Sequence, residues 1–288
     1  MSVMRVAAIQ MRTRGTIDSN CSDFERFVRE AATAGAKYVQ TPEMTGILQK
    51  SRKDLFSQIK PQEDDALVKL AASLARELGI WLHIGSHAIR LEEQKAANRA
   101  FVFSPDGLLT ATYDKIHMFD VDLANGERWC ESNVYQPGKR SRVIEVEDAK
   151  LGISICYDVR FPDLYRQQAL AGASILTAPS SFTRHTGKAH WHLLMRARAV
   201  ENGAFMISAA QGGKHEDGRE TFGHSLIVNP WGEVVAEKAD EETGIIFAEL
   251  DLDEVGQARA RIPNLANIRD FVLEDGIENI TSVVEAAE

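Results

Sequence analysis

The chain is poor in cysteine, with only three among its 288 residues, and it has no long hydrophobic run. Cys21, Cys130 and Cys156 are odd in number and widely spaced, so they suit neither a disulfide framework nor a zinc site of paired cysteines, and we expect reduced thiols. No stretch approaches the roughly 18 apolar residues of a membrane helix, and the first residues, MSVMRVAAIQMRTRG, lack the apolar segment of a signal peptide. These absences predict a cytoplasmic protein with no membrane partner.

Clustered positive charge is also missing. The 33 Lys and Arg residues are outnumbered by 42 Asp and Glu residues, which gives a formal net charge of −9 at pH 7. Nucleic-acid binding depends on clustered Lys and Arg side chains, and no basic stretch stands out. We therefore expect no nucleic-acid partner.

Several motifs of catalysis and cofactor binding are absent. The sequence has no H-E-x-x-H, no G-x-S-x-G, no P-loop and no G-x-G-x-x-G. The segment HWH at 190–192 lies on a predicted helix, where positions i and i+2 do not share a face, and this argues against a metal clamp. We expect neither a cofactor nor a metal ion.

What the sequence does have is a regular alternation of apolar strands and helical patterns. With 44% apolar residues, a chain of this length can bury a large core. Period-two alternation and β-branched content predict strands at 4–10, 37–41, 80–89, 98–104, 108–116, 141–147, 151–156, 174–180, 204–210, 224–229 and 244–250. Helical spacing predicts helices at 22–34, 63–78, 161–171, 190–202 and 252–261.

The connections between these elements indicate the fold class. Turn-forming residues in SPDGLL, EDAKLG and NPWGEVV join pairs of strands as hairpins, while the other strands are linked through helices. No linker or low-complexity tract divides the chain. We predict a single α/β domain over residues 1–288, with two mixed sheets packed face to face and helices on both outer faces.

Two charged residues stand where predicted strands end. Glu43 follows the run AKYVQTP, at the carboxyl edge where α/β sheets bind ligands, although a solvent-facing loop Glu is the ordinary alternative. Lys115 continues the alternate-residue row of Leu109, Ala111 and Tyr113, which predicts an inward-facing ammonium group. Such a cation is costly unless it is paired or functional; the alternative is a Lys that reaches out to water.

Cys156 ends the strand LGISIC and precedes the turn YDVRFPDL. A free Cys is commonly buried as a small hydrophobe, so packing and catalysis both stay open on this ground. Asp158 and Asp163 would oppose a thiolate, so a very low pKa of the Cys156 thiol does not follow. A carboxylate base, a thiol nucleophile and a cation that stabilises an oxyanion would together make a sensible apparatus for attack on a carbonyl or nitrile carbon.

Seven segments, found in order across nearly the whole chain, carry a family resemblance: TPEMTG, YDKIHMFDVD, WCESNVYQPG, GISICYDVRFPDL, APSSFT, AHWHLLMRARAVENGAF and GHSLIVNPWGEVV. They resemble the nitrilase superfamily of carbon-nitrogen hydrolases. The resemblance implies that Glu43, Lys115 and Cys156 are the Glu-Lys-Cys catalytic set and that Glu131 is the additional active-site Glu. It also implies that the backbone N–H of Tyr157 contributes to the oxyanion hole.

The segments CESNVYQPG, CYDVRFPDL and AAQGGKHEDGRETFGHS are most similar to the Nit1-type deaminated glutathione amidases, and next to the omega-amidases. This resemblance implies a four-layer αββα sandwich that dimerises through its sheet-flanking helices and its C-terminal segment, here 252–288. It further implies that the substrate is a small amide of a 2-oxo acid. Two departures occur: Thr41 replaces an apolar residue before Pro-Glu, and the loop MTGILQKSRKDLFSQIKPQEDD, expected to border the pocket, differs from both animal branches.

Residues that read the substrate are harder to assign. Arg160, four residues after Cys156, could make a bidentate pair with a substrate carboxylate, or a structural salt bridge with Asp158 or Asp163. Phe182 and Thr186 match positions that border the pocket in relatives, but could equally pack under a lid. For Cys130 we expect a packing role.

We therefore predict a cofactor-independent amidase that hydrolyses the C–N bond of a small carboxylate-bearing amide through a Cys156 thioester. The alternatives within enzymes are an N-carbamoyl amine hydrolase and a nitrilase. An alternative of another class is a redox-sensing or binding protein that uses the Cys156 thiol without turnover.

Overall fold

The computed structural model describes residues 2–92, 94–123, 126 and 128–273, and it contains two six-stranded mixed sheets. The first sheet, in the order β16-β1-β2-β3-β4-β5, consists of β1 (Val3–Gln10), β2 (Tyr38–Gln40), β3 (Trp81–Arg90), β4 (Ala96–Phe103), β5 (Leu109–Asp114) and β16 (Gly244–Asp251). The second, in the order β15-β14-β11-β10-β9-β8, consists of β8 (Arg142–Val146), β9 (Ala149–Ile153), β10 (Ile175–Thr177), β11 (Phe205–Ser208), β14 (Leu226–Val228) and β15 (Val234–Glu237). In each sheet three adjacent strands pair in parallel, and antiparallel strands flank them on both sides.

The described residues contain six α-helices and three short 3₁₀ helices, which lie between the strands except for the last helix, which follows them. They are α1 (Ile17–Thr33), α2 (Arg52–Gln58), α3 (Ala66–Leu78), α4 (Pro162–Leu170), α5 (Arg184–Asn202), α6 (Asp253–Arg261), η1 (Gln62–Asp64), η2 (Glu131–Asn133) and η3 (Cys156–Arg160). Side-chain caps fix where two of the longer helices begin: Asp65 accepts from the amide of Val68 in α3, and Thr183 accepts from the amide of Thr186 in α5. Gly79 and Gly203 end these two helices in the left-handed conformation.

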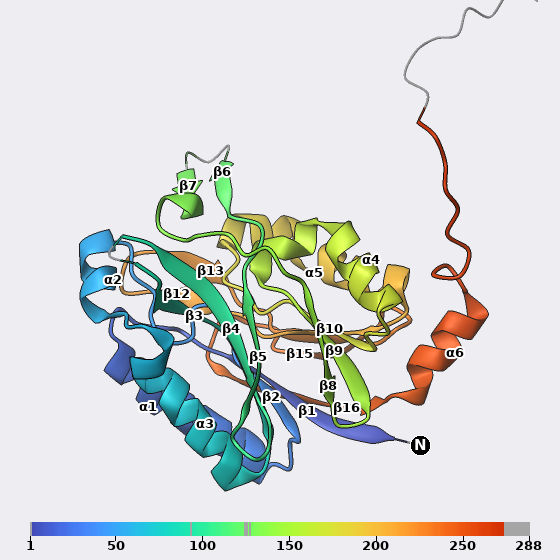
Figure 1. Cartoon of the computed structure of the whole chain (residues 1–288), viewed down its shortest axis with the longest axis horizontal. Coiled ribbons are helices and arrows are strands. Elements are labelled where there is room, and N and C mark those ends of the chain that lie inside the picture. The colour runs from blue at the N-terminus through green and yellow to red at the C-terminus, as the bar shows by residue number, and fades with distance from the viewer. Residues whose placement is uncertain (1, 93, 124–125, 127, 274–288) are drawn as a thin grey trace, which may run out of the picture.

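Strand alternation places the sheets and helices in four layers. Along β1, Val6 and Ala8 point into the core shared with the second sheet, whereas Ala7 and Ile9 point into a second core built with α1 and α3. On the other side of the molecule, Trp191 of α5 packs into the core of the second sheet. Figure 1 shows α1 and α3 on one outer face and α4 and α5 on the other, which confirms the predicted αββα sandwich.

Some boundaries differ from those predicted. The helix expected at 190–202 begins at Arg184, the one expected at 22–34 begins at Ile17, and the one expected at 63–78 begins at Ala66 after a 3₁₀ turn. Helix α2 and two small ribbons were not predicted; the ribbons pair β6 (Asp120–Asp122) with β7 (Arg128–Cys130) and β12 (Gly212–Lys214) with β13 (Glu220–Phe222). Helix α6 confirms the helix expected at 252–261, while 274–288 of the predicted C-terminal segment lies outside the described residues.

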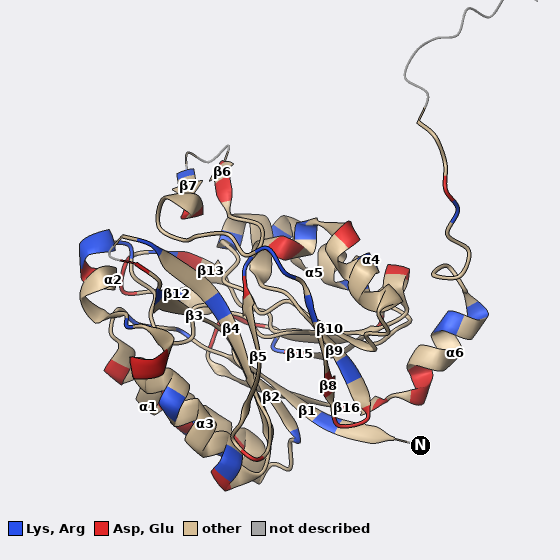
Figure 2. Ribbon diagram, viewed as in Figure 1, with Lys and Arg blue, Asp and Glu red and all other residues tan. Residues whose placement is uncertain are grey.

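The outer surface carries charges of both signs. Figure 2 shows acidic and basic residues interspersed along α1, α3 and α6, and Arg29 of α1 pairs with Glu25 on its own helix and with Glu77 on α3. Within the described residues no helix is long and apolar enough to cross a membrane.

Candidate active site

A cavity of about 400 Å³ lies at one end of the two sheets and brings together the reactive residues that the sequence singled out. Its lining includes Glu43 from the loop after β2, Lys115 directly after β5, Glu131 at the start of η2 and Cys156 at the start of η3. These positions are separated by up to 113 residues in sequence (156 − 43 = 113) and meet because β2 and β5 of the first sheet and β9 of the second all end near the cavity.

Lys115 is at the centre of the polar group in this cavity. Its side chain is 2% exposed, and its Nζ lies 2.8 Å from Glu43 Oε1, 2.8 Å from Glu131 Oε2 and 3.1 Å from Glu131 Oε1. Burial alone would lower the pKa of Lys115, but the charges of Glu131 and Glu43 hold this pKa well above its ordinary value. The predicted inward row is confirmed for Tyr113 and Lys115 and is wrong for Leu109, which is exposed at the open edge of the sheet.

Glu43 is buried and hydrogen-bonded through both carboxylate oxygens. Oε1 accepts from Lys115 Nζ and from Asn98 Nδ2 at 2.9 Å, and Oε2 accepts from the Ser181 amide at 2.9 Å. Burial alone would raise the pKa of Glu43, but the Lys115 charge and hydrogen bonds from Lys115, Cys156 and Asn98 outweigh it and lower this pKa. The group at rest is thus a carboxylate, ready to accept a proton.

Cys156 presents its thiol to this carboxylate. The residue is 7% exposed and has a φ of +48°, a left-handed conformation that a residue with a Cβ adopts at a cost. Its amide donates to Pro179 O at 2.9 Å, and its side chain hydrogen-bonds Glu43. Burial and the neighbouring Glu43 charge raise the pKa of the Cys156 thiol well above its usual value, and Lys115 offsets only part of this. The resting group is a thiol that needs a base.

The turn that carries Cys156 is fixed by Asp158, which is fully buried. Its carboxylate accepts from Tyr113 Oη at 2.7 Å, from the Ile155 amide at 2.9 Å and from the His117 amide at 3.0 Å. These bonds connect η3, which carries Cys156, to β5 of the opposite sheet and to the residues that follow it, so they fix the position of the Cys156 thiol relative to the Lys115 ammonium group.

The structure separates the two readings of Arg160. Because Asp158 is engaged by Tyr113, Ile155 and His117, the salt bridge of Arg160 with Asp158 is wrong, and among the described residues Arg160 forms no ion pair with a carboxylate. The guanidinium instead lines the cavity, 5.4 Å from the ring centre of Phe182, with Nη2 3.3 Å from His190 Nδ1.

The remaining predicted residues also reach the cavity. Tyr157, Phe182 and Thr186 line it, with Phe182 packed edge-on against Trp191 at 5.1 Å. Cys130 lines it as well, but is exposed on β7, so the packing role expected for it is wrong.

Sequence reasoning missed two residues of this site. Asn98, fully buried on β4, donates from Nδ2 to Glu43 Oε1 and, at 3.1 Å, to Glu131 Oε1. A single amide in the apolar run AANRAFVF was its only signal. Arg219, in the turn between β12 and β13, lines the cavity and lies 4.8 Å from the ring centre of Trp129; nothing in its local sequence marks it.

Comparisons with known proteins agree with this geometry. The family model for carbon-nitrogen hydrolases matches residues 5–260. A deaminated glutathione amidase from Synechocystis sp. is 36% identical over 270 residues, covering 92% of this chain and 98% of that protein. The omega-amidase NIT2 of Danio rerio is 35% identical over 269 residues, covering 91% and 94%. Among solved structures, Saccharomyces cerevisiae Nit3, described as a member of branch 10 of the nitrilase superfamily, superposes with a TM-score of 0.81 at 30% identity, covering 91% of this chain and 94% of that one. The chain therefore belongs to the carbon-nitrogen hydrolases of the nitrilase superfamily.

Proposed function

We propose that this hydrolase is an amidase for a small carboxylate-bearing amide, of the deaminated glutathione or 2-oxo acid omega-amide type, and that it works through a thioester on Cys156. The observation that carries the proposal is the meeting of the buried side chains of Glu43, Lys115 and Cys156 in one cavity. The substrate type is supported by the relatives at 35–36% identity and by the charge of the cavity wall.

In the first half of the reaction, Glu43 acts as a general base. Its carboxylate takes the thiol proton of Cys156 while Sγ forms a bond to the carbonyl carbon of the amide. Glu43 then gives this proton to the departing nitrogen as the C–N bond breaks, which releases ammonia or an amine and leaves a thioester.

The developing oxyanion is stabilised by Lys115 Nζ and the backbone N–H of Tyr157. Glu131 and Asn98 do not contact the reacting atoms in this scheme; they hold Lys115 and Glu43 in position through the hydrogen bonds described above. In the second half, Glu43 takes a proton from a water molecule that attacks the thioester, and then returns it to Cys156 as the acid leaves.

The wall of the cavity is rich in cations. Besides Lys115, which two carboxylates neutralise, it is lined by Lys50, Arg52, Arg128, Arg160 and Arg219. Arginine forms bidentate, charge-assisted pairs with carboxylates, so a substrate with one or two carboxylates fits this wall better than a neutral amide does.

The nucleophile is tested by replacing Cys156. We expect Cys156→Ala to lose all detectable amide turnover and the wild-type enzyme to show an acyl adduct on Cys156 by mass spectrometry after rapid quenching. Cys21→Ala, on α1, is the matched control and should keep wild-type turnover. Full turnover by Cys156→Ala would contradict the proposal.

Substrate class is tested by measuring ammonia and amine release over 2-oxo acid amides, deaminated glutathione, N-carbamoyl amines and nitriles. Turnover of carbamoyl compounds or nitriles alone would keep Cys156 as the nucleophile but overturn the amidase assignment.

The alternative of a thiol sensor predicts oxidised sulfur on Cys156 and no acyl adduct. Redox-sensing cysteines are exposed and have a low pKa, whereas the Cys156 thiol is buried and its pKa is raised, so the structure disfavours a sensor.

Arg160 is the residue that we expect to read a substrate carboxylate. Replacing it by Gln should raise KM for a carboxylate-bearing amide about 10- to 100-fold, since charge-assisted hydrogen bonds contribute about 1.5–3 kcal/mol. KM for a neutral amide of similar size should change little, and Arg160→Lys should recover part of the loss. Equal effects on both substrates would assign Arg160 to the structure of the turn instead.

A further inference from the structure

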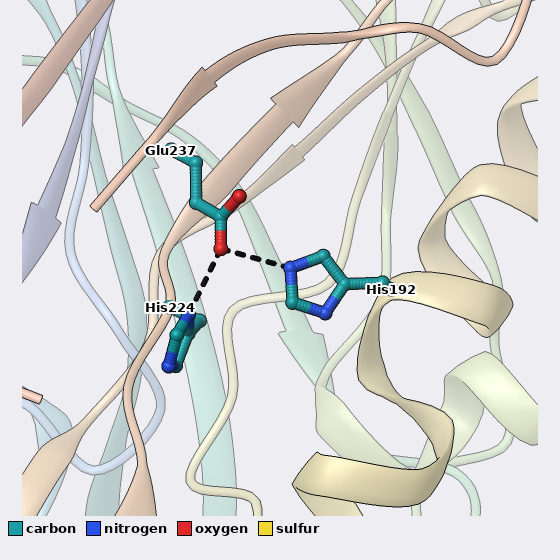
Figure 3. A group of neighbouring side chains, drawn as sticks. All are labelled: His192, His224 and Glu237. Carbon is teal, nitrogen blue, oxygen red and sulfur yellow. Dashed lines mark hydrogen bonds and ion pairs between the residues drawn. The ribbon is translucent and has the colours of Figure 1, made fainter. Parts of the chain in front are cut away.

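Away from the catalytic cavity, two imidazoles and a carboxylate converge on one point (Figure 3). His192 Nε2 and His224 Nδ1 each lie 2.8 Å from Glu237 Oε1. The three come from different elements: α5, the loop before β14, and the end of β15. None of them lines the catalytic cavity, and the scheme above does not use them.

The chemistry of the three groups is that of a transition-metal site. Two imidazole nitrogens and one carboxylate form a ligand set that zinc uses in proteins, with a fourth position left for water. Their ligand atoms all lie within 4.8 Å of one another. Tetrahedral zinc with bonds of 2.0–2.2 Å holds its ligands roughly 3.4 Å apart, so the two nitrogen–oxygen contacts need to open by only about half an ångström.

The surrounding side chains hold the imidazoles in place. His224 stacks on Phe222 at 4.2 Å, and the edge of His192 meets the same ring at 6.2 Å. The backbone carbonyl of His224 accepts from Trp191 Nε1 at 2.7 Å. Trp191 precedes His192 on α5, so this bond holds the backbone of His224 close to His192. His224 also has a φ of +55°, a conformation that a residue with a Cβ adopts only where its surroundings impose it.

Charge and access also suit a cation. The carboxylate of Glu237 faces both imidazoles through Oε1 and supplies the anionic ligand of the group. The side chains of His192, Glu237 and His224 are 39%, 26% and 22% exposed, so an ion can enter from solvent and keep a water ligand.

We propose that His192 Nε2, His224 Nδ1 and a carboxylate oxygen of Glu237 bind one divalent transition-metal ion, with zinc the best fit, and that this ion ties α5 to the β14–β15 hairpin. Two imidazoles select against Mg²⁺ and Ca²⁺, which prefer oxygen ligands. Because α5 also carries Thr186 of the cavity wall, an ion bound here would help to hold the helix that forms one side of the cavity. The site is independent of the amidase assignment.

The test is metal binding by the full chain. Protein stripped with a chelator is dialysed against ZnCl₂, bound zinc is counted by mass spectrometry, and Co²⁺ is titrated in parallel because its visible spectrum distinguishes nitrogen and oxygen ligands from cysteine thiolates. We expect one zinc per chain, and affinity lowered at least about 10-fold in His192→Asn, His224→Asn and Glu237→Gln. Asn tolerates the positive φ at position 224.

His185→Asn is the matched control, because His185 is an exposed His on the same helix. It should bind zinc like the wild type. Circular dichroism and the melting temperature of the metal-free samples show that each variant is folded. Equal zinc affinity in the three ligand variants, a cobalt spectrum of thiolate ligands, or no binding by the wild type at micromolar zinc would overturn the proposal.

Discussion

Asn98 shows how one neutral side chain organises several charges. Its Nδ2 donates to Glu43 at 2.9 Å and to Glu131 at 3.1 Å, so it bridges the two carboxylates that share Lys115. Carboxylates that converge on one ammonium group repel each other, and a donor between them reduces that repulsion. Asn98 is thus a positioning residue for the proposed base rather than a group that touches substrate.

We predict that Asn98→Leu, which replaces the amide by an apolar side chain of similar size, lowers kcat/KM about 10- to 100-fold. This factor corresponds to the free energy of one hydrogen bond to a charged group. The Asn98 hydrogen bond lowers the pKa of Glu43, so its removal raises this pKa. The carboxylate is then protonated at higher pH, and the acid limb of the kcat/KM profile shifts upward. Asn202→Leu, which removes a buried amide that donates only to Arg198 O in α5, is the control: it should cost stability and leave the pH profile unmoved. An unmoved profile in Asn98→Leu would contradict the positioning role.

The residues recovered from sequence had a local signature. Lys115 placed a cation in an inward row of alternating residues, Glu43 followed an apolar run, Cys156 ended another, and the family resemblance related the three to one another. Asn98 lacked such a signature because what makes it matter is its distance to two residues far along the chain. The cluster of His192, His224 and Glu237 was missed for the same reason: the helix argument at HWH holds for His190 and His192, but the neighbours of His192 come from the loop before β14 and from β15.

At the scale of elements, helix ends and turns set the boundaries. The first six residues of α5, RHTGKA, show no apolar stripe, so the sequence pattern begins at 190, whereas the Thr183 cap starts the helix at Arg184. The β6–β7 and β12–β13 ribbons have three residues per strand, too few for alternation to be read. The long strands and the four layers could be predicted because their periodicity is sustained over many residues.

Two glycines test this account of helix ends. Gly79 ends α3 at a φ of +62° with no atom within 4 Å of an added Cβ, so Gly79→Ala changes backbone strain alone. We expect the free energy of unfolding to fall by about 1 kcal/mol. Gly256 is a solvent-exposed residue in the middle of α6, and an added Cβ there also has no atom within 4 Å. Gly256→Ala should therefore have the opposite effect and raise the free energy of unfolding by about 0.5–1 kcal/mol. Urea denaturation at constant m measures both, and a loss of stability in both variants would refute the distinction.

At the scale of the whole molecule, one outer face of the described structure, formed by α5 and the turn between β14 and β15, exposes three large apolar side chains. Leu193 and Val200, seven residues apart on α5, are 68% and 49% exposed, and Trp231 is 50% exposed in the turn between β14 and β15. The two elements are in contact, because Arg196 donates to the Gly232 carbonyl at 2.7 Å and Val200 lies against Gly232. Large apolar side chains exposed on neighbouring elements are typical of protein interfaces. This face includes one of the sheet-flanking helices that the family resemblance predicts at a dimer interface, so we propose that two copies pair through it.

Leu193→Asp tests the pairing. In an isologous interface each substitution occurs twice, and a residue near its centre lies close to the same residue of the other copy. The two introduced carboxylates would lose water on pairing and would repel each other, which destabilises the dimer. We expect the wild type to sediment as a dimer at micromolar concentration and Leu193→Asp as a monomer. Leu108→Asp is the matched control, because Leu108 is 62% exposed in the turn between β4 and β5 and not on this face; it should remain dimeric. A dimeric Leu193→Asp would exclude this face as the interface, and a monomeric wild type would exclude the dimer, since the apolar face would then be stable in water without a partner.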